Sequence, residues 1–292
     1  MIITYGSSSE RLARSIAKIA GLRLIGTTMR RFPDGELYVR VVGDPSGEDV
    51  AVVQSLGLQP DRLLMEYCMI AEALKGGSCK SVTAIVPYLA YARQDSRFNP
   101  GEPLSVQLVA RLIEVSGTDR LISVDAHLHR LAGLGEVFTI PTINLTAMPL
   151  LAKYYRDRYG SANAVVVGPD SESEQWAKVV SRILSVNYVI LSKERLDDRK
   201  VRITGSLPVR GKKAVLVDDI ISTGKTVAGA IGKLKAGGAR TVDVLVTHAI
   251  LVEGALDCLR EAGLSHLIST DTVRRPSSRV SVAAIIAEAL KK

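Results

Sequence analysis

The sequence has no long apolar run, few cysteines and few aromatic side chains. None of its apolar runs approaches the roughly 18 residues of a membrane span, and its start, MIITYGSSSE, lacks the charged-then-apolar build of a signal peptide. Cys68, Cys79 and Cys258 are an odd number without C-x-x-C spacing, which disfavours structural disulfides and a zinc cluster. We therefore expect a protein of a reducing compartment, the cytoplasm, without a membrane partner.

Negative charge is also in short supply, because 38 Lys and Arg face 30 Asp and Glu, a net charge of +8. A basic solvated surface, a nucleic-acid partner, or cations gathered around polyphosphate substrates would each account for the excess. Aromatic residues are only 4% of the chain and no nucleic-acid recognition motif appears, so we expect no nucleic-acid partner. The motifs have to decide between the other two.

Short segments rich in Val, Ile and Leu alternate with segments of helical spacing. The latter include DRLLMEYCMIAEALKGG and TVAGAIGKLKAGG, whose apolar residues recur at three and four positions and which end in a Gly pair. This alternation is typical of α/β units with buried parallel sheets. The expected strands are 50–56, 82–89, 121–127, 164–170, 188–193, 214–219 and 242–248.

The chain repeats one pattern. Residues 51–89 and 214–251 each show a strand, a loop, a helix, a glycine stop and a second strand. Their separation of about 160 residues predicts two similar α/β domains rather than a short-period solenoid.

A domain boundary is expected near 139–149, which has two prolines and no periodicity. We place an N-terminal domain at 1–142 and a C-terminal domain at 143–275. A last helix, within 276–292, could pack on either domain, and the N-terminal domain is our expectation.

The stretch VLVDDIISTGKT, residues 215–226, ends an apolar run in two aspartates before a Ser/Thr/Gly cluster. A nucleotide P-loop needs Gly five positions before Gly224, where Asp219 stands. Successive N–H groups at a strand-to-helix turn can instead cradle a phosphate, while carboxylates accept from hydroxyls, so a sugar phosphate would satisfy both halves. The alternative, an acid pair that merely caps a turn, leaves two costly charges at a buried strand. The first copy has Gln54 and Ser55 in place of the acids, so we expect the site only in the second copy.

This stretch resembles the ribose-phosphate signature of type I phosphoribosyltransferases. Five other segments resemble, in order, motifs of the ribose-phosphate pyrophosphokinases (phosphoribosyl pyrophosphate synthetases), and the resemblance spans about residues 1–290. It implies two similar α/β domains of type I phosphoribosyltransferase-like fold, each with a central, mainly parallel sheet flanked by helices. The five segments are RFPDGELYVR (31–40), PYLAYARQDSRFNPGEPLS (87–105), SVDAHLHRLAGL (123–134), GPDSESEQWAKVV (168–180) and VILSKERLDDRKVRITGS (189–206).

The resemblance also implies where the substrates bind. An aromatic ring suits a purine, arginine can stack on a base or fork onto phosphate oxygens, and the N-terminal domain takes ATP. The implied ATP contacts are Phe32, Asp34, Glu36, Arg93, Gln94, Arg97 and His127, and the first three lie on a loop that, in the family, reaches a neighbouring subunit. The implied ribose 5-phosphate contacts are Asp170, Asp218, Asp219, Ser222, Thr223, Gly224, Lys225 and Thr226.

The implied catalytic residues are Lys193, Arg195 and His127, of which the two cations would stabilise charge on a transferring phosphoryl group. The implied ligands of Mg²⁺ are His127, Asp170 and Asp125. His129 completes a D-x-H-x-H pattern that would suit a dinuclear metal hydrolase, but too few further ligands follow it in the sequence.

The expected reaction transfers the β,γ-diphosphoryl group of Mg-ATP to O1 of ribose 5-phosphate, and the expected assembly is a homodimer or higher homo-oligomer with a shared ATP site. A phosphoribosyltransferase would explain 215–226 but not 31–40 or 87–105. A catalytically inactive regulatory relative would explain only the unusual Ser-Glu-Ser-Glu run at 171–174.

Overall fold

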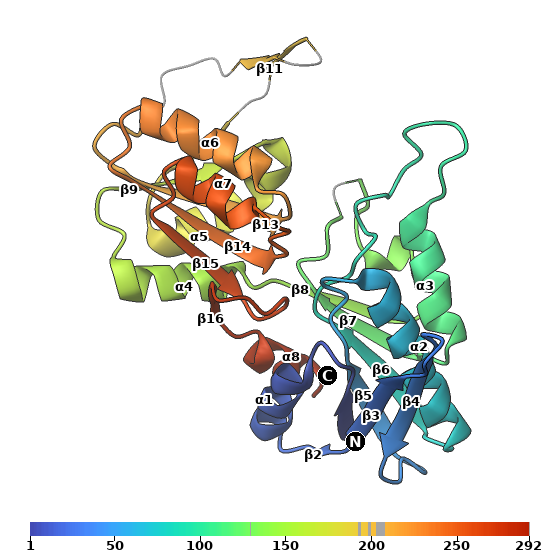
Figure 1. Ribbon diagram of the computed structural model, residues 1–292. Helices are drawn as coiled ribbons and strands as arrows, with labels where there is room; N and C mark the ends of the chain where they lie inside the picture. Colours follow the sequence, from blue (N-terminus) through green and yellow to red (C-terminus); the bar gives the residue numbers. More distant parts are fainter. Residues whose placement is uncertain (129, 192–193, 198–199, 203–207, 292) are drawn as a thin grey trace. The chain divides into compact units, whose positions relative to one another are not determined.

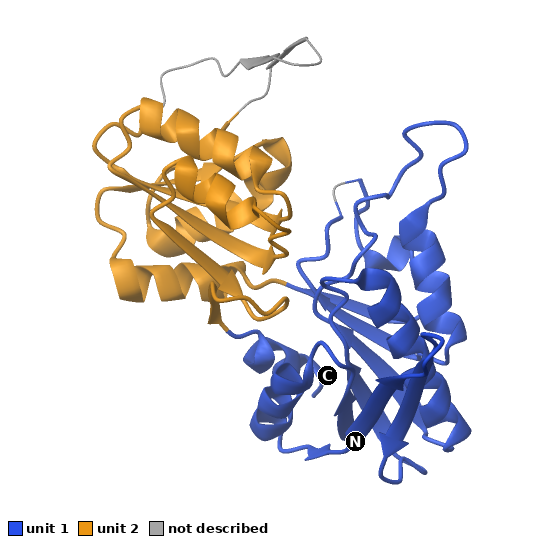
Figure 2. Ribbon diagram, viewed as in Figure 1, with its two compact units in different colours: residues 1–145, 281–292 blue, residues 146–280 orange. Residues whose placement is uncertain are grey.

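The computed structural model describes residues 1–128, 130–191, 194–197, 200–202 and 208–291, with backbone only for 194–197 and 200–202. The chain forms two compact units (Figure 2). Unit 1 is Met1–Leu145 with Ser281–Lys292, and unit 2 is Thr146–Val280. The first boundary between the units therefore lies after Leu145, where residue 142 was expected, and the second lies after Val280, where residue 275 was expected.

Unit 1 is built on a parallel sheet whose strands are almost entirely apolar because helices cover both faces. Helices α1 (Glu10–Ala20) and α8 (Ala283–Ala289) lie on one face, and α2 (Pro60–Gly76) and α3 (Ser105–Val115) on the other (Figure 1). The sheet order is β2 (Arg23–Leu24), β1 (Ile2–Tyr5), β5 (Asp49–Val53), β6 (Ser81–Val86), β7 (Arg120–Val124) and β8 (Thr142–Leu145).

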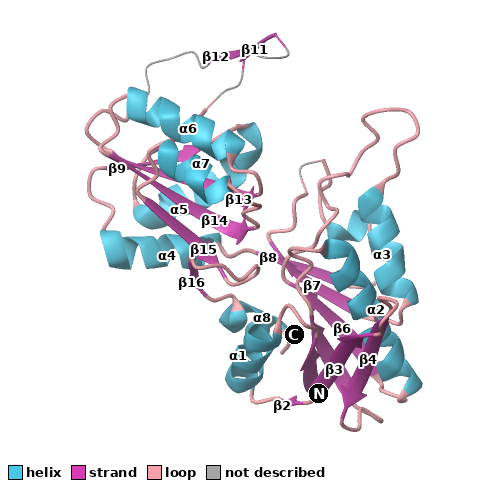
Figure 3. Ribbon diagram, in the orientation of Figure 1, coloured by secondary structure: helices cyan, strands magenta, loops and turns pink. Residues whose placement is uncertain are grey.

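A two-stranded antiparallel hairpin forms a second, separate sheet in this unit (Figure 3). Its strands are β3 (Gly26–Arg31) and β4 (Leu37–Val42), and β4 packs on α2. A short 3-10 turn, η1 (Leu134–Glu136), precedes β8.

Unit 2 repeats the same architecture with a second parallel sheet. Helices α4 (Met148–Tyr159) and α5 (Glu174–Leu184) cover one face, and α6 (Lys225–Ala236) and α7 (Ala255–Glu261) cover the other. The sheet order is β10 (Tyr188–Ile190), β9 (Ala164–Gly168), β13 (Lys213–Ile221), β14 (Thr241–Ala249), β15 (His266–Thr270) and β16 (Ser278–Val280). The remaining elements are η2 (Ser171–Ser173) and the antiparallel pair β11 (Glu194–Asp197) and β12 (Lys200–Arg202).

The two sheets have equivalent strand orders, which confirms the α/β fold class of two similar domains. Each unit includes one helix that directly follows the last strand of the other unit's sheet in the chain. Helix α4 comes after β8 but packs on α5, and α8 comes after β16 but packs on α1. All seven expected strands are present, although their ends are shifted. No helix in the described part of the chain is long and apolar enough to cross a membrane.

Candidate functional site

The aspartate pair lies inside β13, which continues to Ile221, and not at the end of the strand as expected. Asp219 is 2% exposed, whereas Asp218 is partly exposed. The N–H of Asp219 donates to Oδ1 of Asp218 at 3.0 Å. Asp218 is therefore the better placed of the two acids to meet a ligand.

The turn after β13 has a backbone shape that favours glycine. Gly224 has φ 76° and precedes α6 as its N-cap residue, and a Cβ at this position would lie 3.1 Å from the carbonyl oxygen of Ala255. The start of the turn is anchored to the next loop, because the carbonyls of Ile221 and Ser222 accept from the N–H groups of Leu251 and Val252 at 3.0 and 3.1 Å.

This turn offers donors that the described part of the chain does not use. Helix α6 begins without a side-chain cap, so its first N–H groups are free to meet a ligand. Within the described residues, no hydrogen bond or ion pair engages the side chains of Ser222, Thr223, Lys225 or Thr226. A helix N-terminus with free N–H groups, hydroxyls and a lysine is suited to a phosphate.

A third carboxylate lies near the aspartate pair. Burial raises the pKa of Asp218 well above its ordinary value, and the charges of Asp219 and Asp170 raise it further. Asp170 also caps the next helical turn, since its Oδ1 accepts from the N–H of Ser173 at 3.2 Å. The Ser-Glu-Ser-Glu run thus forms η2 and the start of α5, with Asp170 held at its entrance.

In unit 1, the loop between β6 and α3 carries three of the expected ATP contacts. Arg93 and Arg97 are exposed, and in the described chain the Arg93 guanidinium has no partner. Nε of Arg97 donates to the Glu102 carbonyl at 3.0 Å, and Oε1 of Gln94 accepts from Ser105 Oγ at 2.6 Å. These two hydrogen bonds tie residues of the loop to Glu102 and Ser105 near the start of α3, while the Arg93 side chain stays exposed.

The loop after β7 lies beside the loop after β6. An ion pair of 2.8 Å joins Arg130 Nη1 to Asp95 Oδ1, so His127 and the arginines are brought to one edge of the sheet. The strand ends at Val124, and Asp125 has φ 39°, so the extended strand expected through His127 is not present. Asp125 is buried, at 4% exposed, whereas His127 is partly exposed.

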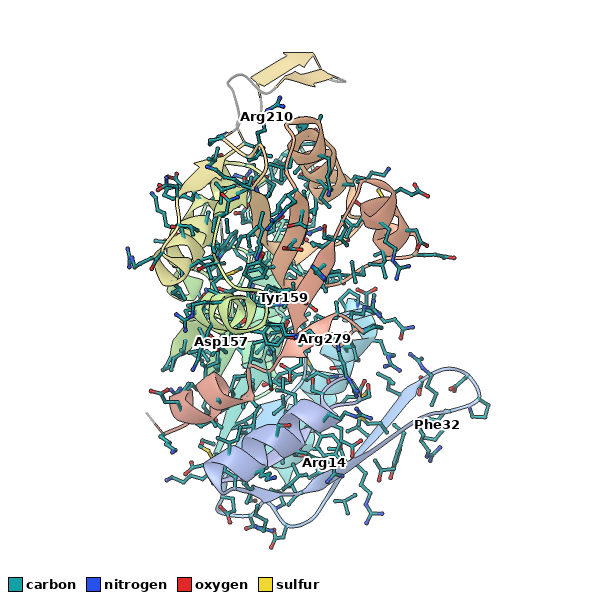
Figure 4. All side chains as sticks on the ribbon, turned by 90° about the vertical axis from the view of Figure 1, so that its left-hand side faces the viewer. Arg14, Phe32, Asp157, Tyr159, Arg210 and Arg279 are labelled. Carbon is teal, nitrogen blue, oxygen red and sulfur yellow. The ribbon has the colours of Figure 1, made fainter. Side chains whose placement is uncertain are left out.

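The third expected group of ATP contacts lies on the β3–β4 hairpin. Phe32, Asp34 and Glu36 form the tight end of the β3–β4 hairpin, where Phe32 N–H donates to the Glu36 carbonyl at 2.9 Å. Figure 4 shows Phe32 at the free end of this ribbon. Phe32 is 38% exposed, and the Arg30 guanidinium lies 4.6 Å from its ring centroid. In the described chain, no hydrogen bond or ion pair links this hairpin end to Arg93.

Two expected residues and one side chain fall outside the described residues. Lys193 and His129 are not described, and of Arg195 only the backbone, in β11, is described.

Sequence reasoning missed the acids that hold the loop after β6. Glu102 accepts from the side chain of Asn99 and from the N–H groups of Asn99 and Phe98, and these bonds lower the pKa of Glu102. Asp95 pairs with Arg130, as described above. The sequence did contain a signal for them, because Asp95 and Glu102 stand close to Arg93 and Arg97 in a segment expected to bind an anionic ligand.

A parallel sheet that leads through two acids into a donor-rich turn before a helix defines a protein of the phosphoribosyltransferase class. Residues 133–280 match the family model described as "Phosphoribosyl transferase domain", and residues 1–117 match the "N-terminal domain of ribose phosphate pyrophosphokinase". The chain belongs to the ribose-phosphate pyrophosphokinase family, whose members are transferases of nucleotide biosynthesis.

Relatives are similar over the whole chain. The ribose-phosphate pyrophosphokinase of Methanothermobacter thermautotrophicus is 40% identical, with 98% of each chain covered. That of Methanobrevibacter smithii is 38% identical, with 99% of this chain and 100% of the relative covered. The crystal structure of phosphoribosylpyrophosphate synthetase from Mycobacterium smegmatis superposes with a TM-score of 0.89 at 34% identity, covering 99% of this chain and 97% of that one. The family expected from the motifs is thereby confirmed.

Proposed function

We propose that the chain transfers the β,γ-diphosphoryl group of ATP to O1 of D-ribose 5-phosphate, giving 5-phospho-α-D-ribose 1-diphosphate and AMP. The observation that carries the proposal is the turn at 222–226, whose donors have no partner among the described residues and which follows the strand that carries the acid pair. A phosphate in the turn leaves the sugar hydroxyls to carboxylate acceptors such as Asp218.

In the proposed step, the O1 oxygen attacks the β-phosphorus in line. The O1–Pβ bond forms, and the bond between Pβ and the oxygen bridging to the α-phosphate breaks. AMP leaves with that oxygen, and the proton of the O1 hydroxyl passes to water. Such a transfer depends on positioning and charge neutralisation. Arg93, Gln94 and Arg97 would bind ATP, and Lys193, Arg195 and His127 would stabilise the transferring group.

Mg²⁺ is the proposed metal. The chemistry of the donors fits, because carboxylate oxygens suit a hard cation, and crowding of Asp218 with Asp219 and Asp170 is relieved by positive charge. Among the described residues, no three His, Cys, Asp or Glu side chains are grouped to hold a metal ion by themselves. We propose Asp125 and His127 of unit 1 and Asp170 of unit 2 as candidate ligands, each of which would meet the metal alongside substrate phosphates, whose charge the metal would neutralise.

The direct test is incubation with Mg-ATP and ribose 5-phosphate, with AMP and ADP resolved by chromatography. The proposal predicts AMP in equal amount to the phosphorylated sugar. Formation of ADP would instead show an ordinary kinase, and no turnover would favour an inactive regulatory relative.

We further propose a cytoplasmic homo-oligomer whose ATP site is shared between subunits. The support is the position of Phe32, 38% exposed at the end of a hairpin that, in the described chain, makes no hydrogen bond or ion pair with Arg93. Mixing Phe32→Ala chains with Asp218→Asn chains should restore part of the activity, because one mixed site then has both residues intact. Unrestored activity in verified mixed oligomers would refute the sharing.

A further inference from the structure

The amino ends of the parallel strands carry equivalent turns in the two units. In unit 1, Gly47 N–H donates to the Ser78 carbonyl at 3.0 Å, and Lys80 N–H to the Glu48 carbonyl at 2.8 Å. In unit 2, the N–H of Gly211 donates to the Gly238 carbonyl, and the N–H of Arg240 donates to the Lys212 carbonyl, both at 2.8 Å. Lys212 therefore stands where unit 1 has Glu48, and Arg240 stands where it has Lys80.

Unit 1 balances the charges at this edge. Glu48 accepts from the N-terminal ammonium and from Arg23, both at 3.3 Å. Asp49 lies 3.5 Å from Lys80, and Asp119 lies 2.7 Å from Lys75. Every cation named here therefore has a carboxylate partner.

Unit 2 has no acid at these three positions. Strand register places Lys213 at the position of Asp49, since they pair with Thr241 and Ser81 respectively. Ser265 stands at the position of Asp119. The N–H of Ser265 donates to the Val242 carbonyl, and the N–H of Asp119 donates to the equivalent Val82 carbonyl, both at 2.8 Å. Over its whole length, unit 2 holds 21 of the 38 Lys and Arg and 14 of the 30 Asp and Glu, so it is also the more basic unit.

Some of the unbalanced cations have a structural task. Lys213 Nζ donates to the carbonyls of Tyr159 and Gly160 at the end of α4, at 2.7 and 3.4 Å, and Lys235 Nζ donates to the Arg240 carbonyl at 3.4 Å. Cations at a helix C-terminus are favoured by the helix dipole, so these side chains need no ligand.

Arg210, Lys212 and Arg240 have no such task, and we call them the basic edge. They lie on turns outside the last turn of any helix, and in the described chain their side chains have no hydrogen bond or ion pair. Arg210 and Arg240 are exposed, and Figure 4 shows Arg210 at the surface of unit 2. The two turns are held together by backbone bonds, so the three cations are displayed side by side.

We propose that the basic edge binds a linear chain of phosphate groups, that is, inorganic polyphosphate. The N–H groups of Gly211 and Gly238 are already used within the protein, so the edge has no closed cradle for a single phosphate. A chain with repeated charges would contact all three cations together. The ring of Tyr159 at this edge stacks on Tyr155 and lies tilted against His266, with ring centroids 5.3 and 4.7 Å away, so this ring is not available to stack on a nucleobase.

This surface is separate from the proposed sugar-phosphate site. The basic edge lies at the amino ends of β13 and β14, whereas the turn at 222–226 follows the carboxyl end of β13. Ligand binding at one can therefore be measured while the other is filled.

The test is fluorescence anisotropy with end-labelled polyphosphate in the presence of saturating ribose 5-phosphate. Neutralising the edge with Arg210→Gln, Lys212→Gln and Arg240→Gln should weaken binding at least about tenfold. It should also reduce the slope of log K against log salt concentration by about 2, with basal activity unchanged. The matched control neutralises three exposed cations of unit 1 by Arg11→Gln, Lys18→Gln and Arg111→Gln. It should stay within about twofold of wild type if the edge, and not net charge, is responsible.

An equal loss in both triple variants, or undiminished binding by the edge variant, would overturn the proposal. Two competitors test the chemistry. Polyglutamate or a single-stranded oligonucleotide that competes as strongly as polyphosphate would show that the edge does not select a bare phosphate chain.

Discussion

The loops that follow β5 in unit 1 and β13 in unit 2 occupy equivalent positions, but only the second leaves its donors free. In unit 1, Gln54 replaces Asp218 and is fully buried. Its Oε1 accepts from Ser8 Oγ at 2.8 Å, and its Nε2 donates to the Leu63 carbonyl at 3.2 Å. The polar group at this position is satisfied inside the protein and cannot serve a ligand.

The helices that follow these loops differ in the same way. Both have a left-handed N-cap residue, Gln59 with φ 67° and Gly224 with φ 76°. Helix α2 then begins with Pro60, which has no N–H to donate. Nearby, the carboxylate of Glu66 accepts from the N–H and Oγ of Ser7, both at 2.8 Å, as an internal anion. The same backbone arrangement thus gives two kinds of loop. We call the loop of unit 1 closed, because its polar groups are bonded within the protein, and the loop of unit 2 open, because its donors are left for a ligand. The side chains at equivalent positions make this difference.

The largest expected effect comes from exchanging the acid at the open loop. Asp218→Asn should lower kcat/KM for ribose 5-phosphate by about 100-fold, because the amide presents a donor where two hydroxyls need acceptors. Gln54→Glu in unit 1 should change stability but not kcat/KM. Steady-state kinetics on both variants checks this, and an equal loss of kcat/KM in both would remove the distinction between the loops.

The glycine at the open turn should be less replaceable than its counterpart. Gly224→Ala should weaken ribose 5-phosphate binding at least about tenfold, because a Cβ at φ 76° costs about 1–2 kcal/mol and lies 3.1 Å from the Ala255 carbonyl oxygen. Gln59→Gly removes a strained side chain and should leave affinity unchanged. Calorimetric titration of each variant gives the comparison, and tolerance of Ala at 224 would contradict the proposed turn geometry.

A hydroxyl of the open turn should contribute to phosphate binding alone. Thr226→Val removes a donor while keeping the volume, so the Kd for ribose 5-phosphate should rise about tenfold. The Kd for ATP should not change, because its proposed contacts lie in unit 1. A rise in the Kd for ATP with ribose 5-phosphate unaffected would assign the turn to the nucleotide.

In the closed loop, the internal carboxylate should matter for stability only. Glu66→Gln should lower the free energy of unfolding by about 1–3 kcal/mol, because it disturbs two buried acceptors. Urea unfolding with circular dichroism measures this change. Weaker ribose 5-phosphate binding by a properly folded Glu66→Gln protein would mean that the closed loop serves the substrate.

The smallest expected effect concerns pH and Asp218 in the protein without ligands. Its pKa is raised in the folded state, so this group contributes stability below its unfolded pKa of about 4, which is lost as pH rises through the folded value. Asp218→Asn should therefore raise Tm at pH 7 by a few degrees, with the gap closing toward pH 4. The exposed Asp157→Asn is the control, and a gap that widens at low pH would contradict the sign.

Periodicity and short motifs were sufficient to predict the fold class, because buried parallel strands are continuously apolar and the helices keep their spacing. Local geometry was less accessible. β13 runs two residues past the acid pair, and Asp125 turns out of the extended conformation, because loop contacts such as those of Leu251 and Leu145 with these segments are long-range. No sequence pattern revealed that Asp219 is buried while Asp218 meets solvent. The exposure of Phe32 at the end of the β3–β4 hairpin also depends on tertiary packing.

The most direct test of one open and one closed loop is the stoichiometry of ribose 5-phosphate binding. Isothermal titration of the wild-type protein should give one site per chain, and Asp218→Asn combined with Thr226→Val should abolish that site while the Kd for ATP is retained. Two sites per chain, or one site that survives the double substitution, would contradict the account.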